Sequence, residues 1–311
     1  MILTVTLNPS IDKSYIVQNF KLNGIHRAQK MMALPGGKGI NVSRVLHSLG
    51  VPTKATGIVG GFTGKKIEKF LKKESVPYSF VQIRAESRTN ILILDEFSDM
   101  HCEINEQGPS IPVGAWDRLY IKLKDLAPSC SWVVFAGSPP SETSPQIYYR
   151  LIKQVQEYGV KVALDTRGKW LEEGIKAKPN FIKPNWDEFQ ELVGPVHSTV
   201  HAFQQARRIE ARGVDTIIIS TGSNGALAIH DGQSYCVRSL PKIEVVSPVG
   251  SGDSLVAGFL AKFRNGSDFP EALRHGLALG CSNATNFGAG LFDLEEVNSL
   301  SQQIDLDELP Y

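Results

Sequence analysis

Short apolar runs alternate with helical stretches along most of this chain, and this alternation restricts the fold more than any other feature. Between residues 53 and 220, candidate strands are separated by segments whose apolar residues recur at helical spacing. The runs at 132–136 and 216–220 are apolar almost throughout, as expected for strands buried on both faces. Because parallel strands need crossover connections, the pattern predicts an α/β fold with a mostly parallel central sheet covered by helices.

Two segments interrupt this alternation. Residues 10–34 and 88–105 contain candidate strands without intervening helices, and the second reads as a hairpin. We expect them to pair as a small separate sheet. Since a glycine-rich loop directly follows the first segment, that sheet should lie near the ligand and act as a lid. The sequence shows no internal repeat or linker, so we predict one domain, 1–311, that carries this lid.

Charge and composition exclude several classes of partner. The 311 residues include 33 Lys and Arg against 32 Asp and Glu, a net charge of +1, so no extended field attracts nucleic acid or an anionic membrane. No apolar run is long enough to span a bilayer. The four cysteines form no C-x-x-C pair, and the N-terminal segment lacks a basic region and alternates like a strand. We therefore expect a cytoplasmic protein whose anion sites are local.

The first candidate site is the glycine-rich loop at 248–254, which follows a predicted β-rich run beginning at Val245 and precedes an apolar helical segment. Such a loop directs several backbone N–H groups to one point, where the helix dipole also favours an anion. Asp253 falls in the first helical turn, where the dipole favours its ionised form. A carboxylate beside an anion site indicates phosphoryl transfer to a hydroxyl. The alternative is a tight turn with a helix-capping aspartate.

A second glycine-rich loop, residues 35–39, also precedes a helical segment and includes Lys38. A cation among free N–H groups favours anion binding over a simple turn. Two known motifs are absent. Leu255 occupies the position of the third glycine in G-x-G-x-x-G, and no G-x-x-x-x-G-K-[ST] string occurs. The loops are therefore not explained by either nucleotide-binding motif.

These two loops, with residues 183–188 and 220–225, resemble four motifs of the phosphofructokinase B-type sugar kinases of the ribokinase-like superfamily. The motifs occur in the family's order, and the resemblance covers nearly the whole chain. Departures include Ser251 in place of alanine, Pro248 where threonine is frequent, and Arg167 where a small residue is common. The resemblance implies a ribokinase-like three-layer α/β/α fold with a small β lid, ATP as phosphoryl donor, and Mg²⁺.

The resemblance also assigns roles to residues. Asp253 would be the catalytic base, with N–H donors from Gly250, Ser251 and Gly252. Acceptor binding is implied for Asp12, Arg27, Gly37, Lys38, Gly39, Asn41, Arg88 and Ser138. Nucleotide binding is implied for Lys183, Asn185, Ser220, Thr221, Gly222, Ser223, Gly225 and Asn283. Asn185 and Glu188 would hold Mg²⁺ through water; the alternative is that they only start a helix after Pro184.

Three basic residues indicate that the acceptor carries a phosphate. Arg27, Lys38 and Arg88 align with positions that hold a phosphate in phosphosugar-specific members of the family. The resemblance therefore implies a phosphotransferase that acts on the free primary hydroxyl of a ketohexose monophosphate. It is closest to the 1-phosphofructokinase and tagatose-6-phosphate kinase subgroups, and the string at 103–109 favours fructose 1-phosphate over tagatose 6-phosphate or fructose 6-phosphate.

Two other classes of protein fit the sequence less well than a kinase does. A non-catalytic sensor of nucleotides or sugar phosphates would be expected to lack the base, yet Asp253 is present. A nicotinamide-dependent oxidoreductase is disfavoured by the missing third glycine. Small isolated sheets with open edges are marginally stable, so we expect a homodimer formed through the lid.

Overall fold

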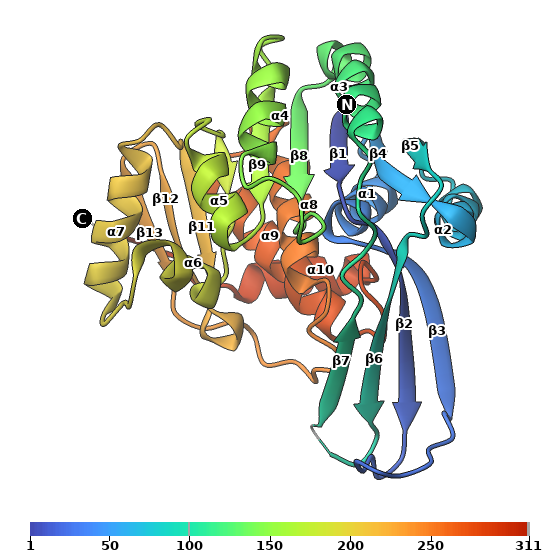
Figure 1. Ribbon diagram of the computed structural model, residues 1–311. Coiled ribbons are helices and arrows are strands. Elements are labelled where there is room, and N and C mark those ends of the chain that lie inside the picture. The colour runs from blue at the N-terminus through green and yellow to red at the C-terminus, as the bar shows by residue number, and fades with distance from the viewer. Residues whose placement is uncertain (99, 310–311) are drawn as a thin grey trace.

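The computed structural model describes residues 1–98 and 100–309, and its named strands form two sheets (Figure 1). The larger sheet contains, in chain order, β1 (Ile2–Thr6), β4 (Thr53–Gly60), β5 (Tyr78–Ile83), β8 (Trp132–Ala136), β9 (Lys161–Asp165), β10 (Phe181–Ile182), β11 (Thr216–Ser220), β12 (Ala226–His230), β13 (Gln233–Val237) and β14 (Asp307–Leu309). The small sheet contains β2 (Ser10–Val17), β3 (Lys30–Gly36), β6 (Arg88–Asp95) and β7 (His101–Asn105).

The helices are α1 (Lys38–Ser48), α2 (Gly61–Lys73), α3 (Val113–Leu126), α4 (Ile147–Gln156), α5 (Gly168–Ile175), α6 (Trp186–Val193), α7 (Thr199–Glu210), α8 (Ser251–Phe263), α9 (Phe269–Ala284) and α10 (Leu294–Gln303). In the described ranges, none of them is both long and apolar enough to cross a membrane.

The larger sheet has the order β14-β13-β12-β11-β10-β9-β8-β1-β4-β5. From β5 to β11 every neighbouring pair is parallel, which confirms the predicted mostly parallel sheet. The last three strands pair antiparallel at one edge, which the sequence analysis did not assign. Asp231 and Gly232 join β12 to β13 with φ of 47° and 75°, a two-residue hairpin turn whose Asp-Gly signal is present in the sequence.

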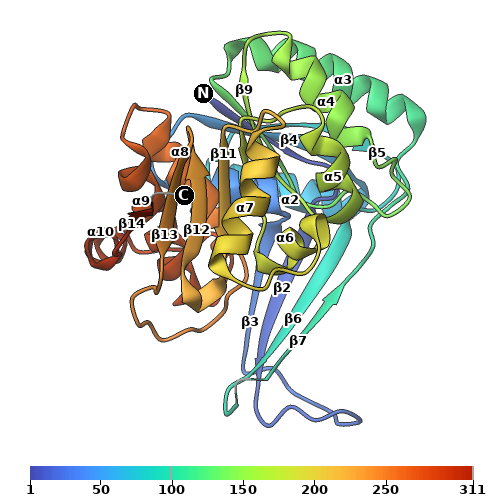
Figure 2. The same cartoon turned by 90° about the vertical axis from the view of Figure 1, so that its left-hand side faces the viewer.

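Helices cover both faces of this sheet, as predicted (Figure 2). Side chains of α3, α4, α5, α6 and α7 pack in one core with strand residues such as Val133 and Phe135. Those of α1, α8, α9 and α10 pack in a second core with Trp132 and Val134. Successive residues of β8 thus point to opposite cores, because strand side chains alternate between faces. The strand is apolar throughout for this reason.

Two local predictions are wrong. The run that begins at Val245 is a loop, with Val245 58% and Val246 40% exposed. The backbone N–H groups of Val246 and Ser247 both donate to Ala284 O, at 2.8 and 3.0 Å, so this segment is tied to the end of α9 instead of to a sheet. In addition, the sequence did not lead us to predict α5.

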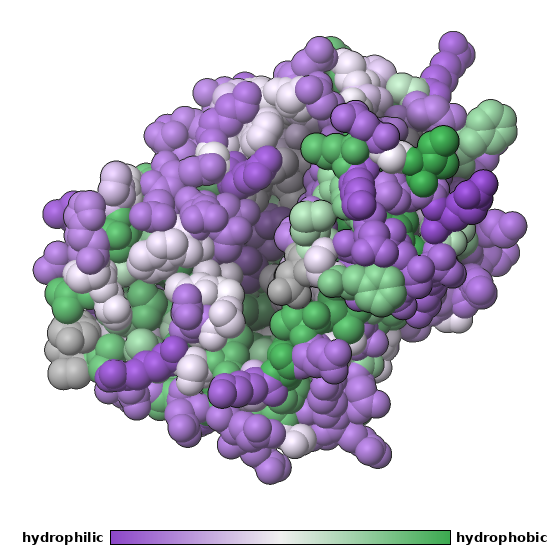
Figure 3. Space-filling model, turned by 90° about the horizontal axis from the view of Figure 1, so that it is seen from below, coloured by the Kyte–Doolittle hydropathy of each residue, from purple (hydrophilic) through white to green (hydrophobic). Residues whose placement is uncertain are grey.

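The small sheet is separate, as predicted, and projects from the larger body (Figure 1). The segments 10–34 and 88–105 supply its strands; residue 99 lies outside the described residues. β2 pairs antiparallel with β3 and parallel with β6, and β6 pairs antiparallel with β7. Figure 3 views the molecule from below and shows a hollow beside the small sheet.

Candidate active site

The loop at 248–254 joins the body to α8 and presents the N-terminus of that helix. Gly250 is its N-cap, with φ 86° in the left-handed region, and a Cβ there would lie 2.6 Å from Ala289 Cβ. Only glycine fits such a position without strain. The N–H groups of Gly250 and Gly252 have no backbone partner among the described loop and turn bonds, so they can receive an anion as predicted, whereas Ser251 N donates to Pro248 O at 3.2 Å.

Asp253 lies in the first turn of α8 and is 5% exposed. Its Oδ2 accepts a hydrogen bond of 2.8 Å from Asn41 Nδ2, in the first turn of α1. Two predicted site residues, 212 positions apart, therefore meet between two helix N-termini.

The electrostatics of Asp253 differ from the prediction. Burial raises its pKa to about 7, and this effect outweighs Lys38, which lowers the pKa; Asp165 raises it further, and the Asn41 hydrogen bond and Lys183 lower it. The expectation that the helix dipole would keep an ordinary ionised carboxylate was wrong, because desolvation dominates at this depth. A carboxyl with this pKa changes protonation near neutral pH.

Two lysines and two carboxylates surround Asp253. Lys38 Nζ lies 2.9 Å from Asp165 Oδ1 and 3.5 Å from Glu188 Oε1, and Lys183 Nζ lies 3.7 Å from Asp165 Oδ1. Burial lowers the pKa of Lys38, but Asp165, Glu188 and Asp253 together raise it above its ordinary value. Burial likewise raises the pKa of Asp165, and the two lysines reverse this and lower it. Lys38 and Asp165 are therefore charged at neutral pH.

Asn185 and Glu188 form the helix start that the sequence analysis kept as the alternative. Asn185 Oδ1 accepts from Glu188 N, and Glu188 Oε2 accepts from Asn185 N, both at 2.8 Å, which is a capping box at α6. The described residues contain no group of three or more His, Cys, Asp and Glu that could hold a metal. Mg²⁺ needs only one or two carboxylates when water and phosphate complete its shell. Asp165 Oδ2 is buried with no partner in the described part of the chain, so Asp165 and Glu188 fit such an ion.

A cavity of about 60 Å³ lies between the small sheet and the body. It is lined by Asp12, Lys13, Ser14, Leu34, Asn41, Asn90, Ile91, Leu92, Glu103, Asn105, Ser247, Val249, Phe287, Gly288 and Ala289. Asp12 Oδ1 accepts hydrogen bonds from Ser10 Oγ at 2.6 Å and from Asn90 Nδ2 at 2.9 Å. Burial raises the pKa of Asp12, and these two bonds lower it, with a net increase. Asp12 and Asn41, both predicted to bind the acceptor, meet at this cavity.

The three predicted phosphate-binding cations do not converge within one chain. Lys38 pairs with carboxylates beside Asp253. Arg88 donates Nε–H to Asn8 O at 3.0 Å and Nη1–H to Glu106 O at 3.2 Å, where the small sheet joins the body. Arg27 is exposed in the loop between β2 and β3, which run away from the body. The expected convergence was wrong because motif spacing does not show how far these strands extend.

Some of the other predicted residues lie near Asp253 or Asn185, and others hold the backbone around them in place. Gly37 is the N-cap of α1 with φ 99°, and Gly39 packs against Thr6. Ser138 is half-buried after β8. A Cβ on Gly252 would lie 3.2 Å from Lys183 Nζ, so the Lys183 side chain lies next to Gly252. Ser220 ends β11 and bridges to Asn185, and the residues that follow the strand are Thr221, Gly222, Ser223 and Gly225.

Asn283 has a supporting position in α9. It donates to Val249 O at 2.8 Å and accepts from Gly290 N at 2.7 Å, so it fixes the loop before α8. The sequence analysis missed Asp165, Asn90, Ser10 and Ser247. Asp165 had a usable signal, since it is a carboxylate at the carboxyl end of a predicted strand, where ligands of such sheets bind.

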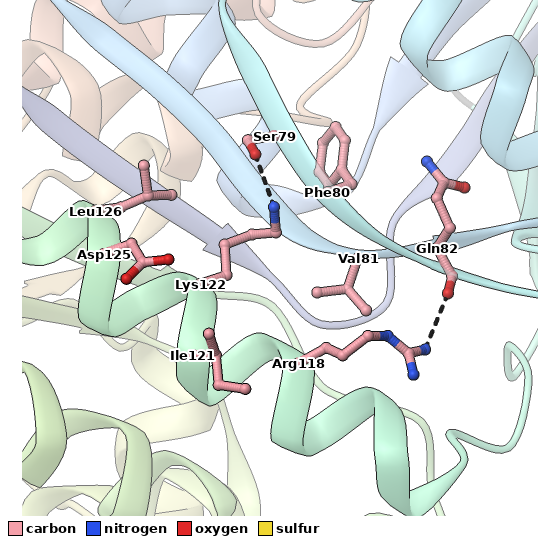
Figure 4. Close-up of a pocket in the computed structure, with 9 residues that line it drawn as sticks. All are labelled: Ser79, Phe80, Val81, Gln82, Arg118, Ile121, Lys122, Asp125 and Leu126. Carbon is pink, nitrogen blue, oxygen red and sulfur yellow. Dashed lines mark hydrogen bonds between the residues drawn. The ribbon is translucent and has the colours of Figure 1, made fainter.

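A larger cavity, about 520 Å³, lies elsewhere, between β5 and α3 (Figure 4). Its cations are engaged with β5: Arg118 Nη2 donates to Gln82 O at 3.1 Å and Lys122 Nζ to Ser79 Oγ at 2.8 Å. None of the predicted site residues lines it. The larger cavity is therefore separate from the candidate site around Asp253.

Comparison with known proteins agrees with this geometry. Residues 5–296 match the family model of pfkB family carbohydrate kinases. The 1-phosphofructokinase of Borreliella burgdorferi is 35% identical over 311 residues, 99% of each chain. A Thermotoga maritima structure described as a possible 1-phosphofructokinase has a TM-score of 0.92 at 28% identity, over 99% of each chain. The tetrameric inhibited form of Escherichia coli phosphofructokinase-2 has a TM-score of 0.88 at 25% identity, over 97% of this chain and 98% of that one.

The raised pKa of Asp253 predicts a pH-dependent effect on stability. Because the folded-state pKa of about 7 exceeds the ordinary value of 3.8, the folded state binds the proton more tightly, and this stabilisation is lost as pH rises toward 7. Asp253→Asn removes the titration. We expect urea unfolding to show that the variant gains about 2–3 kcal/mol relative to wild type between pH 5 and pH 8.

The control is Asp117→Asn, at an exposed aspartate on α3. It should change stability by the same small amount at both pH values. An equal effect of Asp253→Asn at pH 5 and pH 8 would contradict the assignment.

Proposed function

The chain belongs to the pfkB family of carbohydrate kinases, as its motifs predict, and from that premise we propose that it is a 1-phosphofructokinase. It transfers a phosphoryl group from ATP to the free primary hydroxyl of fructose 1-phosphate and produces fructose 1,6-bisphosphate. The observation that carries the proposal is the buried Asp253, with a pKa of about 7, in the first turn of α8 and bonded to Asn41, which lines the cavity beneath the small sheet. The 1-phosphofructokinase relative supports the acceptor.

Asp253 acts as the base. At neutral pH a large fraction of this carboxyl is ionised, and it can accept the proton of an attacking hydroxyl. Asn41 donates to Oδ2 and so fixes the orientation of the carboxylate. The N–H groups of Gly250 and Gly252 stabilise charge on the transferred group, which matters most because phosphoryl transfer depends chiefly on positioning and electrostatics.

The donor side of the site is the charged cluster. Lys38 and Lys183 offer positive charge to the nucleotide phosphates, and residues 220–225 follow β11 next to Asn185. When bound, Mg²⁺ supplies further charge neutralisation, and Asp165 and Glu188 are the residues that would hold it through water. The four cysteines are free, which is consistent with a reducing cytoplasm as its compartment.

The acceptor side is the cavity beneath the small sheet. Two amide oxygens of its lining residues, Asn41 Oδ1 and Asn90 Oδ1, are buried without partners in the described ranges. Sugar hydroxyls are donors that satisfy such atoms. The cavity of about 60 Å³ is smaller than the roughly 300 Å³ of the smallest typical ligand sites. Entry of the acceptor therefore requires the small sheet to move, which supports its action as a lid.

The direct test is an ADP-release assay over a panel of acceptors. We expect fructose 1-phosphate to be the best acceptor, ahead of fructose 6-phosphate and tagatose 6-phosphate, with free fructose, ribose and nucleosides poor. Asp253→Asn should abolish turnover while ATP binding remains, and wild-type kcat/KM should fall below pH 7 as the base is protonated. A free sugar or nucleoside as the best acceptor would refute the proposal. Preference for tagatose 6-phosphate would leave a kinase with a different substrate.

Lys38 and Arg88 should have separable roles. Because Lys38 lowers the pKa of Asp253, Lys38→Met should reduce kcat and move the acidic limb of the pH profile to higher pH. Two of the five N–H groups of Arg88 donate to carbonyls, and we propose that others bind the acceptor's phosphate. Arg88→Met should raise the acceptor KM more than about tenfold, as expected for loss of a charge-assisted bond, without moving the pH limb.

Arg84→Met, at an exposed arginine before the small sheet, is the matched control and should leave both parameters unchanged. If Arg88→Met left the KM of the acceptor unchanged, or if both variants altered the same parameter alone, this division of roles would be wrong.

The small sheet also suggests how copies associate. Its outer face carries Met31, 57% exposed, and Ile104, 54% exposed, whereas the alternate residues Glu103 and Asn105 line the cavity. An apolar outer face on a four-stranded sheet is best covered by a second copy. A related enzyme, Escherichia coli phosphofructokinase-2, has been solved as a tetramer. We propose a homodimer through the small sheet.

Light scattering should therefore find a dimer, and a Met31→Glu, Ile104→Glu double variant should shift it toward monomer. Val113→Glu, which changes an even more exposed apolar residue on α3, should not. A monomer at every concentration, with and without substrate, would exclude this assembly.

A further inference from the structure

One row of the small sheet's inner face carries polar side chains from three strands. Asp12 of β2 is the register partner of Asn90 of β6, and Asn90 is the partner of Asn105 of β7. Register partners project on the same face of a sheet as close neighbours. All three residues line the acceptor cavity. The middle position, Asn90, has no role in the mechanism described so far.

The hydrogen bonds of Asn90 fix its orientation. Its Nδ2 donates to Asp12 Oδ1 at 2.9 Å and to Ser10 Oγ at 3.1 Å. Since an ionised carboxylate can only accept, the amide nitrogen and not the oxygen must face Asp12. The Oδ1 atom therefore lies on the opposite side of the amide, and it is buried with no partner among residues 1–98 and 100–309.

A buried carbonyl oxygen without a donor is unfavourable, and in native proteins it usually has a partner. Here the neighbouring space is the acceptor cavity, so the acceptor itself is the available donor. Asp12 and Asn90 then present two hydrogen-bond acceptors side by side. This pair is complementary to two adjacent hydroxyl groups, which fructose 1-phosphate carries at C3 and C4.

We propose that Asn90 is a specificity-determining residue, which accepts a hydrogen bond from one hydroxyl of the acceptor's vicinal C3–C4 diol while its amide holds Asp12 toward the other. The proposal rests on the proposed function, because it assumes a polyhydroxylated acceptor in this cavity. It assigns discrimination between ketohexoses that differ in this diol to a strand of the small sheet. A site built to bond a hydroxyl rejects analogues that lack it or misplace it.

The test is a double-mutant cycle in which one change is made at Asn90 and the other is the removal of one hydroxyl from the substrate. Steady-state kinetics would compare wild type, Asn90→Ala and Asn90→Asp with fructose 1-phosphate and its 3-deoxy and 4-deoxy analogues. We expect Asn90→Ala to raise KM about tenfold or more, with a smaller change in kcat. One deoxy analogue should be at least about tenfold worse than the parent for wild type, yet equal to the parent for Asn90→Ala.

Asn90→Asp separates contact from positioning. It keeps an oxygen toward the cavity but places a second carboxylate against Asp12, so it should impair binding most at high pH, where both groups are ionised. Thr89→Ala, the neighbouring position on the opposite face of β6, is the control and should behave as wild type.

Two results would overturn the proposal. If both deoxy analogues keep their full penalty with Asn90→Ala, Asn90 only positions Asp12 and contacts no hydroxyl. If neither analogue is impaired with wild type, the contact does not exist, and this result holds even if the variants fail to fold. Should the acceptor panel identify another sugar phosphate, the cycle is run with that acceptor's deoxy analogues, so an error in the acceptor and an error in Asn90 give different results.

Discussion

Burial of Asp253 between the N-termini of α1 and α8 is the constraint around which this structure is arranged. Its neighbours Lys38 and Lys183 are balanced by Asp165 and Glu188, so two positive charges already meet two negative ones. Asp253 is a third carboxylate, for which no counter-charge remains within this group. Isolated buried charge is costly, and protonation relieves it. Burial is the main cause of the pKa of about 7, Asp165 raises it further, and Lys38 and Lys183 lower it only in part, so Asp253 changes protonation near neutral pH.

The fold assembles these charges from distant parts of the chain. Asp165 ends β9, and Lys183 follows the adjacent β10, so parallel neighbours bring both side chains to one edge of the sheet. Lys38 and Asp253 begin helices whose N-caps, Gly37 and Gly250, have φ of 99° and 86°. These glycines permit the left-handed backbone that turns each helix start toward the site. The mostly parallel topology therefore determines where the chemistry lies.

Sequence reasoning succeeded where the signal was local. Periodicity predicted the parallel sheet, and the glycine-rich loop identified Asp253, because strand period and turn composition depend on neighbouring residues. It failed for properties set by distant contacts. The bond from Asn41 to Asp253 spans 212 positions, and the burial that raises the pKa of Asp253 comes from the assembled core. The sequence also did not predict that Arg27 lies away from the site, because its position depends on the direction in which β2 and β3 extend.

The body and the small sheet contribute different kinds of group to the candidate site. The body holds the charged groups, fixed by ion pairs such as that of Lys38 with Asp165, whereas the small sheet contributes hydrogen-bonding groups such as Asp12 and Asn90. Changes to the charged cluster would leave a buried charge unpaired and would alter Asp253 itself. Changes to the cavity-lining residues of β6 and β7, such as Asn90 and Asn105, leave these ion pairs untouched. A protein of this design can therefore change its acceptor through the small sheet while its phosphoryl-transfer machinery stays intact.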